Sequence, residues 1–270
     1  MLSASADAID RTDDTPTSRP RAPELGLCIS VVSHGQGDLL DRLIADLAAL
    51  PAETVRQVIV TVNRPDDAWQ PARALPQLRV LRNERPRGFG ANHNRAFRHC
   101  TQPCFAVVNP DIRLPQDPFS PLVEALAADP LCELAVPVQA NALGTRETFA
   151  RPVPTPWNVV ARRLSAARRS AHATPARPQW VAGAFMVWRA QRFAELGGFD
   201  ERYFLYCEDV DICLRLQLAG RRFAVVEQAR VLHDARRGSL RSPRHLAWHA
   251  ASLLRLWSSP VFWRYLRHAG

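Results

Sequence analysis

Lysine is absent from this 270-residue sequence, in which all 35 of the Lys and Arg residues are arginine. A P-loop nucleotide site needs a lysine on the phosphates, and an enzyme that uses pyridoxal phosphate needs a lysine for the Schiff base. The absence therefore excludes both classes of enzyme. With 26 acidic residues the formal net charge is +9, which favours polyanionic partners such as nucleotide phosphates, nucleic acid or an anionic membrane surface.

Long apolar runs and paired cysteines are also lacking. No run of about 18 apolar residues occurs, so the sequence predicts no membrane-spanning helix. Residues 1–24 are small, polar and proline-rich without periodicity, which predicts a disordered tail and not a secretory signal. The six cysteines form no CxxC pair and no zinc-like group with histidine, so we expect buried free thiols in a reducing cytoplasm.

Strand-like and helix-like segments alternate along the rest of the chain. β-Branched residues dominate 26–33 and 55–63, and leucines recur at helical spacing between these two runs. The alternation continues and predicts an α/β protein with a parallel, doubly wound sheet and helices on both faces. Ligands bind outside the carboxyl ends of the strands in such sheets, where we expect Asn63 and the Asn-Pro-Asp turn at 109–111.

Three carboxylates, those of Glu208, Asp209 and Asp211, occur in the otherwise apolar stretch LYCEDVDICLRL. A helix beginning near Asp209 would pair Asp211 with Arg215, and its dipole would favour negative charge in the first turn. The same acids could instead be assembled for chemistry. A further isolated acid, Asp111, ends a buried strand, where a carboxylate is well placed to hold Mg²⁺ or Mn²⁺ on a diphosphate, although Asn-Pro-Asp is also a turn sequence.

Several segments, taken in order, resemble the family 2 glycosyltransferases of the GT-A fold, especially the rhamnosyltransferase-like bacterial members. These segments are RGFGANHNRAF, VVNPDIRLP, WVAGAFMVWRAQRFAELGGFDERYFLYCEDVDICLRLQLAGRRF and ARVLHDARRGS. The resemblance covers residues 25–239, and the block from GGFDERYF to LQLAG is its most specific part. It implies the GT-A (nucleotide-diphospho-sugar transferase) fold, an α/β architecture whose mixed, mostly parallel sheet is flanked by helices.

The resemblance also implies roles for individual residues. Asp209 matches the general base of the family's catalytic acid pair, and Glu208 matches its neighbour. Asp111 and His233 match groups that hold a divalent metal, Mg²⁺ or Mn²⁺, and the diphosphate. The positions that match the nucleotide-sugar site are Ser33, Asn63, Gly88, Gly90, Asn94, Asn109 and Asp111. The positions expected to line the acceptor region are Trp180, Gly183 and Asp200.

Two departures from the family pattern concern donor binding. The family usually has an acid before the position of Asn63 that contacts the base, but this sequence has Val62 there. Either Asp66 or Asp67 could substitute, or the base is recognised differently. The family's two-acid metal motif is reduced to Asp111.

The sequence therefore predicts an inverting glycosyltransferase that moves a sugar from a nucleoside-diphosphate sugar to a hydroxyl of a lipid-linked saccharide in cell-surface polysaccharide synthesis. One alternative is a sugar nucleotidyltransferase, but the usual lysine-containing, glycine-rich N-terminal loop is absent. Another is a non-catalytic sugar-binding or nucleic-acid-binding protein. No helix-turn-helix, zinc or RNA-binding signature occurs, so we expect no nucleic-acid partner. The presence of both Asp111 and Asp209 argues against a non-catalytic role.

Residues 240–270 predict a basic, amphipathic helical extension of the 25–239 catalytic domain. Its apolar side chains include Trp248, Leu253, Leu254, Trp257, Phe262 and Trp263, and its cations are Arg241, Arg244, Arg255, Arg264 and Arg267. Helices of this mixture lie in the headgroup region, so we expect peripheral docking at the inner face of the cytoplasmic membrane. In the alternative, these aromatic residues pack on the catalytic domain as a covering helix or form a dimer contact.

Overall fold

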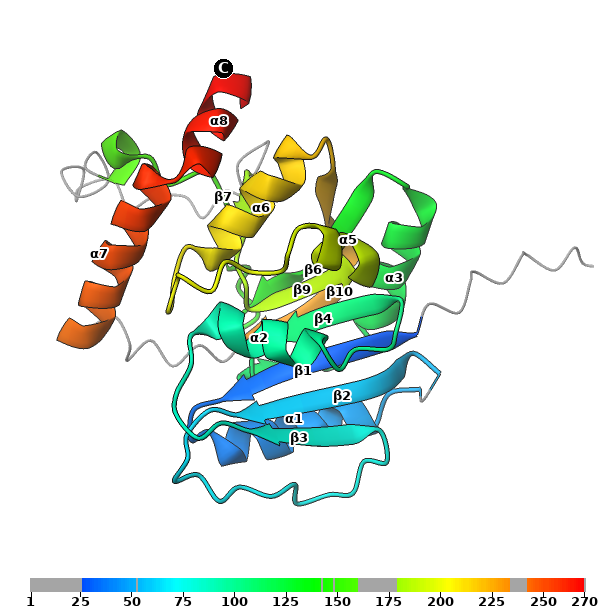
Figure 1. Ribbon diagram of the computed structural model, residues 1–270. Helices are drawn as coiled ribbons and strands as arrows, with labels where there is room; N and C mark the ends of the chain where they lie inside the picture. The colour runs from blue at the N-terminus through cyan, green and yellow to red at the C-terminus, as the bar shows by residue number, and fades with distance from the viewer. Residues whose placement is uncertain are drawn as a thin grey trace, which may run out of the picture.

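The computed structural model describes residues 26–51, 53–141, 143–147, 149–159, 179–233 and 242–269. Figure 1 shows a central sheet with helices in front of it and behind it, and a pair of C-terminal helices at one side. The tail expected at 1–24 lies outside the described residues, as does the domain boundary expected between 239 and 240. All six cysteines are free, and five of them are buried, as the sequence predicted.

Eight strands form the central sheet, in the order β3-β2-β1-β4-β9-β6-β10-β5. Their bounds are β1 (Leu27–Ser33), β2 (Val55–Val62), β3 (Leu78–Arg82), β4 (Cys104–Val108), β5 (Ile112–Arg113), β6 (Cys132–Ala140), β9 (Phe185–Arg189) and β10 (Arg222–His233). A small second sheet pairs β7 (Ala150–Arg151) with β8 (Trp180–Val181). The order places β1 between β2 and β4, the strands that precede the two predicted ligand-binding turns.

The sheet is mixed, which corrects the wholly parallel sheet that the alternation of segments predicted. β9 runs antiparallel to both of its neighbours, β4 and β6, and β5 runs antiparallel to β10. The other neighbouring strands are parallel. Two parallel neighbours need a crossover connection, which is usually a helix. The described chain between β6 and β9 instead forms the small β7–β8 sheet, and β9 runs antiparallel to β6. The mixed, mostly parallel sheet implied by the family resemblance is confirmed.

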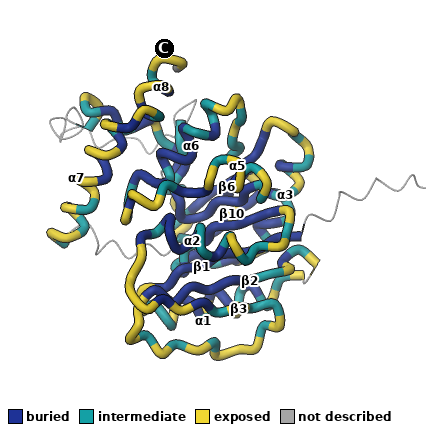
Figure 2. The backbone as a smooth tube through the Cα atoms, in the orientation of Figure 1, coloured by how far each residue is buried: buried dark blue, intermediate teal, exposed yellow. Residues whose placement is uncertain are grey.

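Helices cover both faces of the sheet because the central strands are apolar on both sides. α1 (Gly37–Ala48) and α3 (Phe119–Ala128) pack on one face, and α2 (Phe89–Phe97), α5 (Ala190–Glu195) and α6 (Glu208–Leu218) pack on the other. Successive side chains of a strand point to opposite faces. In β4, Ala106 accordingly joins the first core cluster and Phe105 the second. Figure 2 shows these strands as the most deeply buried part of the chain.

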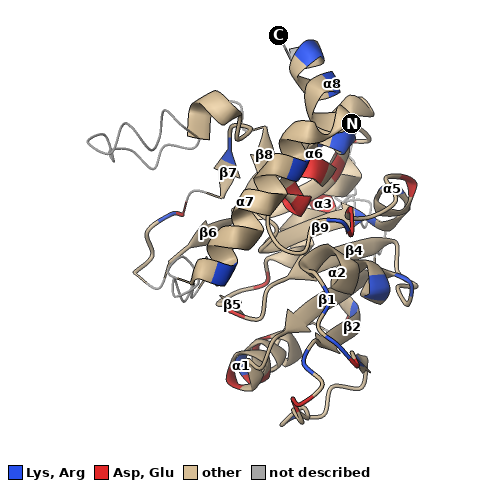
Figure 3. Ribbon diagram, turned by 60° about the vertical axis from the view of Figure 1, so that its left-hand side comes forward, with Lys and Arg blue, Asp and Glu red and all other residues tan. Residues whose placement is uncertain are grey.

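Two helices, α7 (Pro243–Ser258) and α8 (Pro260–Ala269), make up the described C-terminal segment. Ser259 separates them with an extended backbone, as expected for a residue that precedes proline. Its hydroxyl then accepts a hydrogen bond from the N–H of Phe262 in the first turn of α8. Both helices carry arginine and no acidic residue (Figure 3).

The inner sides of α7 and α8 form a third core cluster with α6. Phe262 is fully buried there, with Tyr265 and Leu256, against Leu214 of α6 and Tyr203 before it. The alternative in which these aromatic residues pack on the catalytic domain is therefore correct for the inner side of α7 and α8. The six apolar residues that the sequence placed at a membrane differ in burial. Leu253 and Phe262 are buried, and Trp248 and Trp257 are half-buried. Leu254 and Trp263 are exposed.

We predict that Phe262→Ala lowers the free energy of unfolding by about 3–5 kcal/mol, because it leaves a cavity between α8 and α6. Urea denaturation monitored by circular dichroism measures this loss. Trp263→Ala is the matched control, since the neighbouring side chain is 44% exposed and should cost much less. Equal midpoints for Phe262→Ala and wild type would show that α8 is not part of the cooperatively folded unit.

Candidate active site

A cavity of about 790 Å³ opens at the carboxyl ends of β1 and β4. Its first side comes from the strand-end loops and the start of α2, and is lined by Val32, His34, Gln36, Arg64, Pro86, Arg87, Phe89, Asn109, Pro110 and Asp111. Its second side comes from the segment after β8, the start of α6 and the first half of α7, and is lined by Ala182, Gly183, Ala184, Phe204, Leu205, Glu208, Asp209, Arg244, His245 and Trp248. The position agrees with the general location of ligand sites in open α/β sheets.

A strained turn positions the two acids that begin α6. Tyr206 and Cys207 have φ angles of 74° and 66°, in the left-handed region that non-glycine residues rarely adopt. Each such residue costs on the order of 1–3 kcal/mol and persists only where its surroundings hold it. The turn brings the chain abruptly into α6, so that its first two residues, Glu208 and Asp209, both line the cavity.

Two backbone N–H groups hold the carboxylate of Asp209. Gly183 donates to Oδ2 at 3.0 Å and Val210 donates to Oδ1 at 2.9 Å. Burial raises the pKa of Asp209, and the two N–H donors act in the opposite direction because they stabilise the charged form. A side chain at Gly183 would have its Cβ 3.3 Å from the ring of Phe89, so glycine allows this close approach.

Glu208 is the second buried acid of the pair. Its carboxyl group is buried, and Oε2 has no hydrogen-bond partner in the described part of the chain. Burial, followed by the charge of Asp209, raises the pKa of Glu208 to about 8. The pKa of both acids is therefore raised, and burial is the main cause in each.

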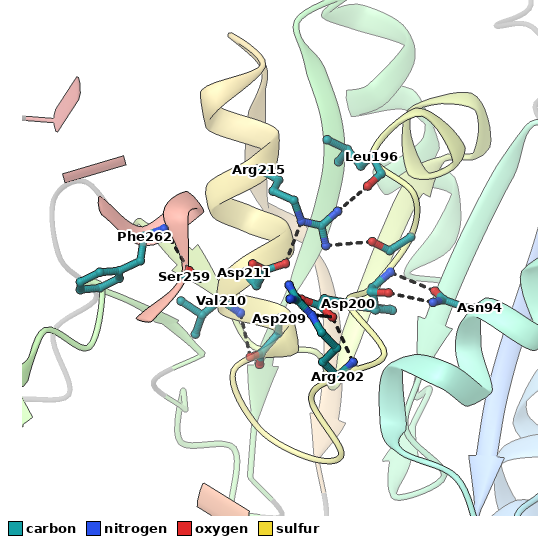
Figure 4. A network of polar contacts seen from close by, with 12 residues as sticks. Asn94, Leu196, Asp200, Arg202, Asp209, Val210, Asp211, Arg215, Ser259 and Phe262 are labelled. Carbon is teal, nitrogen blue, oxygen red and sulfur yellow. Dashed lines mark hydrogen bonds and ion pairs between the residues drawn. The ribbon is translucent and has the colours of Figure 1, made fainter. Parts of the chain in front are cut away.

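The third acid of the stretch, Asp211, has the structural role that its spacing predicted. It is buried and forms an ion pair with Arg215, with 2.7 Å between Oδ2 and Nε. Figure 4 shows that the same guanidinium also donates to the carbonyl oxygens of Leu196 and Gly198. The pair thus ties α6 to the turn after α5 and does not line the cavity.

Asp111 is the acid on the first side of the cavity. Its Oδ1 is buried and accepts no hydrogen bond within the described residues. His233 lies behind it, with Nε2 3.6 Å from this oxygen, while Nδ1 lies 2.8 Å from Oε2 of Glu147. Burial lowers the pKa of His233, but the two carboxylates outweigh this effect and the net shift is upward. Nothing in the sequence indicated that Glu147 would lie at this site.

These groups fit one part of a divalent metal site. Within the described ranges, no group of three or more His, Cys, Asp or Glu side chains is arranged to hold an ion by itself. Mg²⁺ is usually held by one or two carboxylates together with substrate phosphates, so a single strand-end acid is enough. The carboxylate of Asp111, which lines the cavity and has His233 beside it, suits this role. The contact with Glu147 orients the ring of His233 as outer carboxylates orient metal-binding histidines.

Ser33 and Asn63, expected at the nucleotide, lie behind the cavity wall and shape it. Asn63 is fully buried and its side chain binds both backbone groups of Arg87, donating to the oxygen at 2.8 Å and accepting from the N–H at 2.9 Å. The Ser33 hydroxyl accepts a hydrogen bond from the N–H of Gln36. Both residues therefore position neighbours that line the cavity.

Neither candidate for the missing base-contacting acid lines the cavity. Asp66 is exposed and paired with Arg64, and Asp67 accepts a hydrogen bond from the N–H of Trp69. Arg64 itself does line the cavity. Neither acid therefore replaces, in the described lining of the cavity, the base-contacting acid that the family usually has before the position of Asn63.

Gly88, Gly90 and Asn94 of the glycine-rich segment contribute by packing and do not themselves line the cavity. A Cβ on Gly88 would lie 2.7 Å from the carbonyl oxygen of Phe204, and one on Gly90 would lie 2.6 Å from Cβ of Phe199. Asn94 clamps Phe199 by accepting from its N–H at 2.9 Å and donating to its oxygen at 2.8 Å. These positions press α2 against the loop that leads to α6.

Of the three residues expected near the acceptor, only Gly183 lines the cavity. The indole N–H of Trp180 donates to the carbonyl oxygen of Pro152. Asp200 pairs with Arg202 in its own loop (Figure 4). Trp180 and Asp200 lie outside this cavity's lining, and a role for them at the acceptor stays a prediction.

The first half of α7 supplies the wall that the sequence did not place here. Arg244, His245 and Trp248 line the cavity beside the start of α6. The indole of Trp248 lies against the ring of Phe204, with 4.8 Å between centroids. Because 244 and 248 are one helical turn apart, they share a face, but the sequence could not show that this face meets the active site.

α7 also holds the strained turn in place. His245 Nδ1 lies 2.9 Å from the hydroxyl of Tyr206, and Ser252 donates to the carbonyl oxygen of Leu205 at 2.8 Å. Together with the contact between Trp248 and Phe204, these bonds secure three successive residues before the acid pair. The C-terminal helix is therefore part of the site.

Residues 23–251 match the model of the family described as "Glycosyltransferase like family 2". The chain belongs to this family. Among its relatives is the N-acetylglucosaminyl-diphospho-decaprenol L-rhamnosyltransferase of Mycobacterium tuberculosis, 26% identical over 277 residues that cover 88% of each chain. The rhamnosyltransferase WbbL of Escherichia coli is 44% identical over 78 residues, or 28% of this chain and 29% of that protein.

Solved structures confirm the GT-A fold of this family 2 glycosyltransferase. The crystal structure of GalNAc-T7 with UDP, GalNAc and Mn²⁺ has a TM-score of 0.59 at 17% identity, and the match covers 79% of this chain and 44% of that one. The mannosyltransferase PcManGT from Pyrobaculum calidifontis, in complex with GDP-Man and Mn²⁺, has a TM-score of 0.54 at 19% identity, covering 89% and 66%. The predicted fold and enzyme class are both confirmed.

Proposed function

We propose that this glycosyltransferase moves a sugar, a deoxyhexose such as rhamnose, from a nucleoside-diphosphate donor to a hydroxyl of a lipid-linked saccharide in cell-surface polysaccharide synthesis. The observation that carries the proposal is that Asp111 and Asp209 line the same cavity, Asp111 from the turn after β4 and Asp209 from the start of α6. The rhamnosyltransferase relatives support the donor class, and the name of the mycobacterial relative supports a sugar on a lipid diphosphate as acceptor.

The strand-end side of the cavity is suited to the donor. Arg64 and Arg87 line it, and a guanidinium group matches phosphate oxygens in both charge and geometry. Burial and then the charge of Arg64 lower the pKa of His34, so its ring is neutral at pH 7 and can stack or accept a hydrogen bond. Asn109 and Asp111 complete this side at the end of β4.

A divalent ion, Mg²⁺ or Mn²⁺, is proposed to bind at Asp111 with His233 beside it. When bound, such an ion neutralises charge that develops on the departing diphosphate. Two solved structures of the same fold contain Mn²⁺, which supports this choice of cofactor.

Asp209 is proposed as the general base. Its carboxylate lines the cavity and is fixed by the N–H groups of Gly183 and Val210, which stabilise the charged form, so it can accept the proton of an acceptor hydroxyl. That oxygen then forms a bond to the anomeric carbon as the bond to the diphosphate breaks. A single displacement of this kind inverts the anomeric configuration.

The α7 side is suited to the acceptor. Phe204 and Trp248 present aromatic surface beside Asp209, and binding pockets commonly combine such surface with a few orienting polar groups. Arg244 lies over the indole of Trp248, with 4.7 Å from its guanidinium carbon to the centroid. This places a cation at the edge of the aromatic wall, where a phosphate of a lipid-linked acceptor could be bound.

The test is a panel of nucleoside-diphosphate sugars with a lipid-diphosphate saccharide acceptor, in which product and released nucleotide are both measured. We expect one donor to be used, and we expect Asp209→Asn to lower kcat by about 10²–10⁴-fold without a loss of donor affinity. Glu124→Gln is the control, since this exposed carboxylate on α3 lies outside the cavity. Near-normal turnover by a folded Asp209→Asn protein would contradict the assignment of the base.

Metal dependence is tested by calorimetry of nucleoside-diphosphate binding with Mn²⁺ and with EDTA. We predict that Mn²⁺ strengthens binding to wild type and has little effect on Asp111→Ala, because that variant lacks the carboxylate proposed to bind the ion. Asp117→Ala is a control at another acid on the same loop, which caps α3 and does not line the cavity. An equal effect of Mn²⁺ on wild type and Asp111→Ala would contradict a metal site at Asp111.

We also propose that the outer side of α7 and α8 docks on an anionic membrane surface. Leu246, Leu254 and Trp263 are 58%, 65% and 44% exposed there, and residues 242–269 include four arginines and no acid. Each arginine near an anionic surface adds about 1 kcal/mol of attraction. No helix among the described residues combines the length and the apolar character needed to cross a bilayer.

Co-sedimentation with phosphatidylglycerol vesicles at about 0.1 M salt, where surface charges are only partly screened, tests this docking. We expect wild type to pellet and Leu246→Asp/Leu254→Asp to lose at least tenfold in vesicle affinity. Leu143→Asp is the matched control, because Leu143 is 89% exposed on another part of the surface. Wild type that ignores the vesicles, or equal losses in both variants, would refute docking through α7.

A further inference from the structure

A second depression, of about 560 Å³, lies beside the donor side of the cavity. It is formed by the end of β3, the loop that follows and the outer side of α2. We call it the arginine pocket, and its lining residues are Arg82, Asn83, Glu84, Arg85, Arg87, Arg95 and Arg98. Its volume falls within the range of about 300–1,000 Å³ that is typical of small-molecule sites.

The positive charge in the arginine pocket is not neutralised by the protein. None of its five arginines is within ion-pair distance of a carboxylate in the described part of the chain, whereas nine other arginines there are. Glu84 is the single acid in the lining. Like charges that converge on a concave surface repel one another, and an anion bound between them would remove that repulsion.

Two of the arginines are held in place by backbone oxygens. Arg82 donates to the carbonyl oxygens of Asp67 and Trp69, and Arg95 donates to the carbonyl oxygen of Arg82 and to the side chain of Asn83. Asn83 is only 4% exposed, so the floor of the pocket is a buried, fully bonded amide. Charges fixed in advance in this way bind a ligand with a smaller loss of side-chain entropy.

The charge of these arginines also acts on a neighbouring histidine. Burial lowers the pKa of His99, and Arg79, Arg95 and Arg98 lower it further because they disfavour a second cation. Two of these three arginines line the pocket.

The arginine pocket adjoins the active site through a short polar bridge. Asn83 donates to Oδ1 of Asn63 at 2.6 Å, and the same oxygen accepts the N–H of Arg87 at 2.9 Å. The side chain of Arg87 lines both the pocket and the catalytic cavity. A ligand in the pocket would therefore contact the loop that forms one wall of the donor site.

We propose that the arginine pocket is a second anion site, separate from the donor site, that binds a phosphate-bearing ligand. Phosphate is the favoured chemistry because the planar guanidinium group donates two parallel hydrogen bonds that match two phosphate oxygens. Five arginines around about 560 Å³ suit a group with more than one phosphate or a phosphate with a small substituent. The ligand is either a soluble phosphate compound or the headgroup of an anionic lipid.

Calorimetric titration with inorganic pyrophosphate, in EDTA and 0.15 M salt, tests the site. We expect saturable binding to wild type and at least tenfold weaker binding to Arg85→Gln/Arg98→Gln. Neither side chain makes a hydrogen bond or ion pair in the described structure, and neither lines the catalytic cavity, so folding and transferase activity should be retained. The matched control, Arg42→Gln/Arg73→Gln, removes the same charge from exposed positions outside the pocket.

Equal pyrophosphate affinity in wild type and Arg85→Gln/Arg98→Gln, or no saturable binding to wild type, would overturn the proposal. An equal loss in the control variant would also overturn it, because the attraction would then be a property of the net charge. We expect transferase activity to be retained in both double variants. A failure of the anion-site proposal can therefore be told apart from a failure of the proposed catalytic function.

Phosphatidylglycerol vesicles distinguish the two sources of phosphate. This arm uses the Leu246→Asp/Leu254→Asp protein, so that α7 contributes little to vesicle binding. Vesicle binding that is lost when Arg85→Gln/Arg98→Gln is added, and that pyrophosphate displaces, supports the site with a lipid headgroup as its ligand. Pyrophosphate binding with no vesicle binding supports the site with a soluble phosphate ligand.

Discussion

The left-handed turn at Tyr206 and Cys207 is the constraint on which the active site depends. It aims the acid pair at the cavity, and its strain must be opposed by contacts from elsewhere in the fold. α7 supplies them on one side, through His245 and Ser252. α2 supplies them on the other, where Gly88 allows the backbone of Phe204 to approach closely. Catalytic geometry in this enzyme therefore rests on segments that are far from the acid pair in sequence.

Charged groups of both signs line the cavity. The acid pair at the start of α6 is buried, and burial raises the pKa of both Glu208 and Asp209. Arg64 and Arg87 line the strand-end part of the cavity, as does Asp111. Buried acids and guanidinium groups in one cavity suit a reaction in which an acceptor hydroxyl loses a proton and a diphosphate departs. The arginine pocket extends the same positive region beyond the cavity.

The C-terminal helices connect the catalytic site with the outer surface of the protein. The inner side of α7 and α8 packs on α6 and lines the cavity, while the outer side exposes leucine, tryptophan and arginine. The two interpretations of this segment, a membrane-docking helix and a covering helix, therefore apply to different sides of it. A helix has both sides available because residues three and four apart share a face. Membrane docking would therefore act on the same helix, α7, that holds the turn at Tyr206 and Cys207.

The sequence by itself determined the family, the GT-A fold, the strand-end position of Asp111 and the pairing of Asp211 with Arg215, because each depends on local periodicity or on an uninterrupted motif. Tertiary structure alone decided the antiparallel course of β9, the contact of His233 with Glu147 and the packing roles of the residues in the glycine-rich turn. It also moved Arg244 and Trp248 from an expected membrane surface into the cavity wall. The physical reason is that a local pattern shows which residues share a face of a helix or strand, whereas the partner of that face is set by segments distant in the chain.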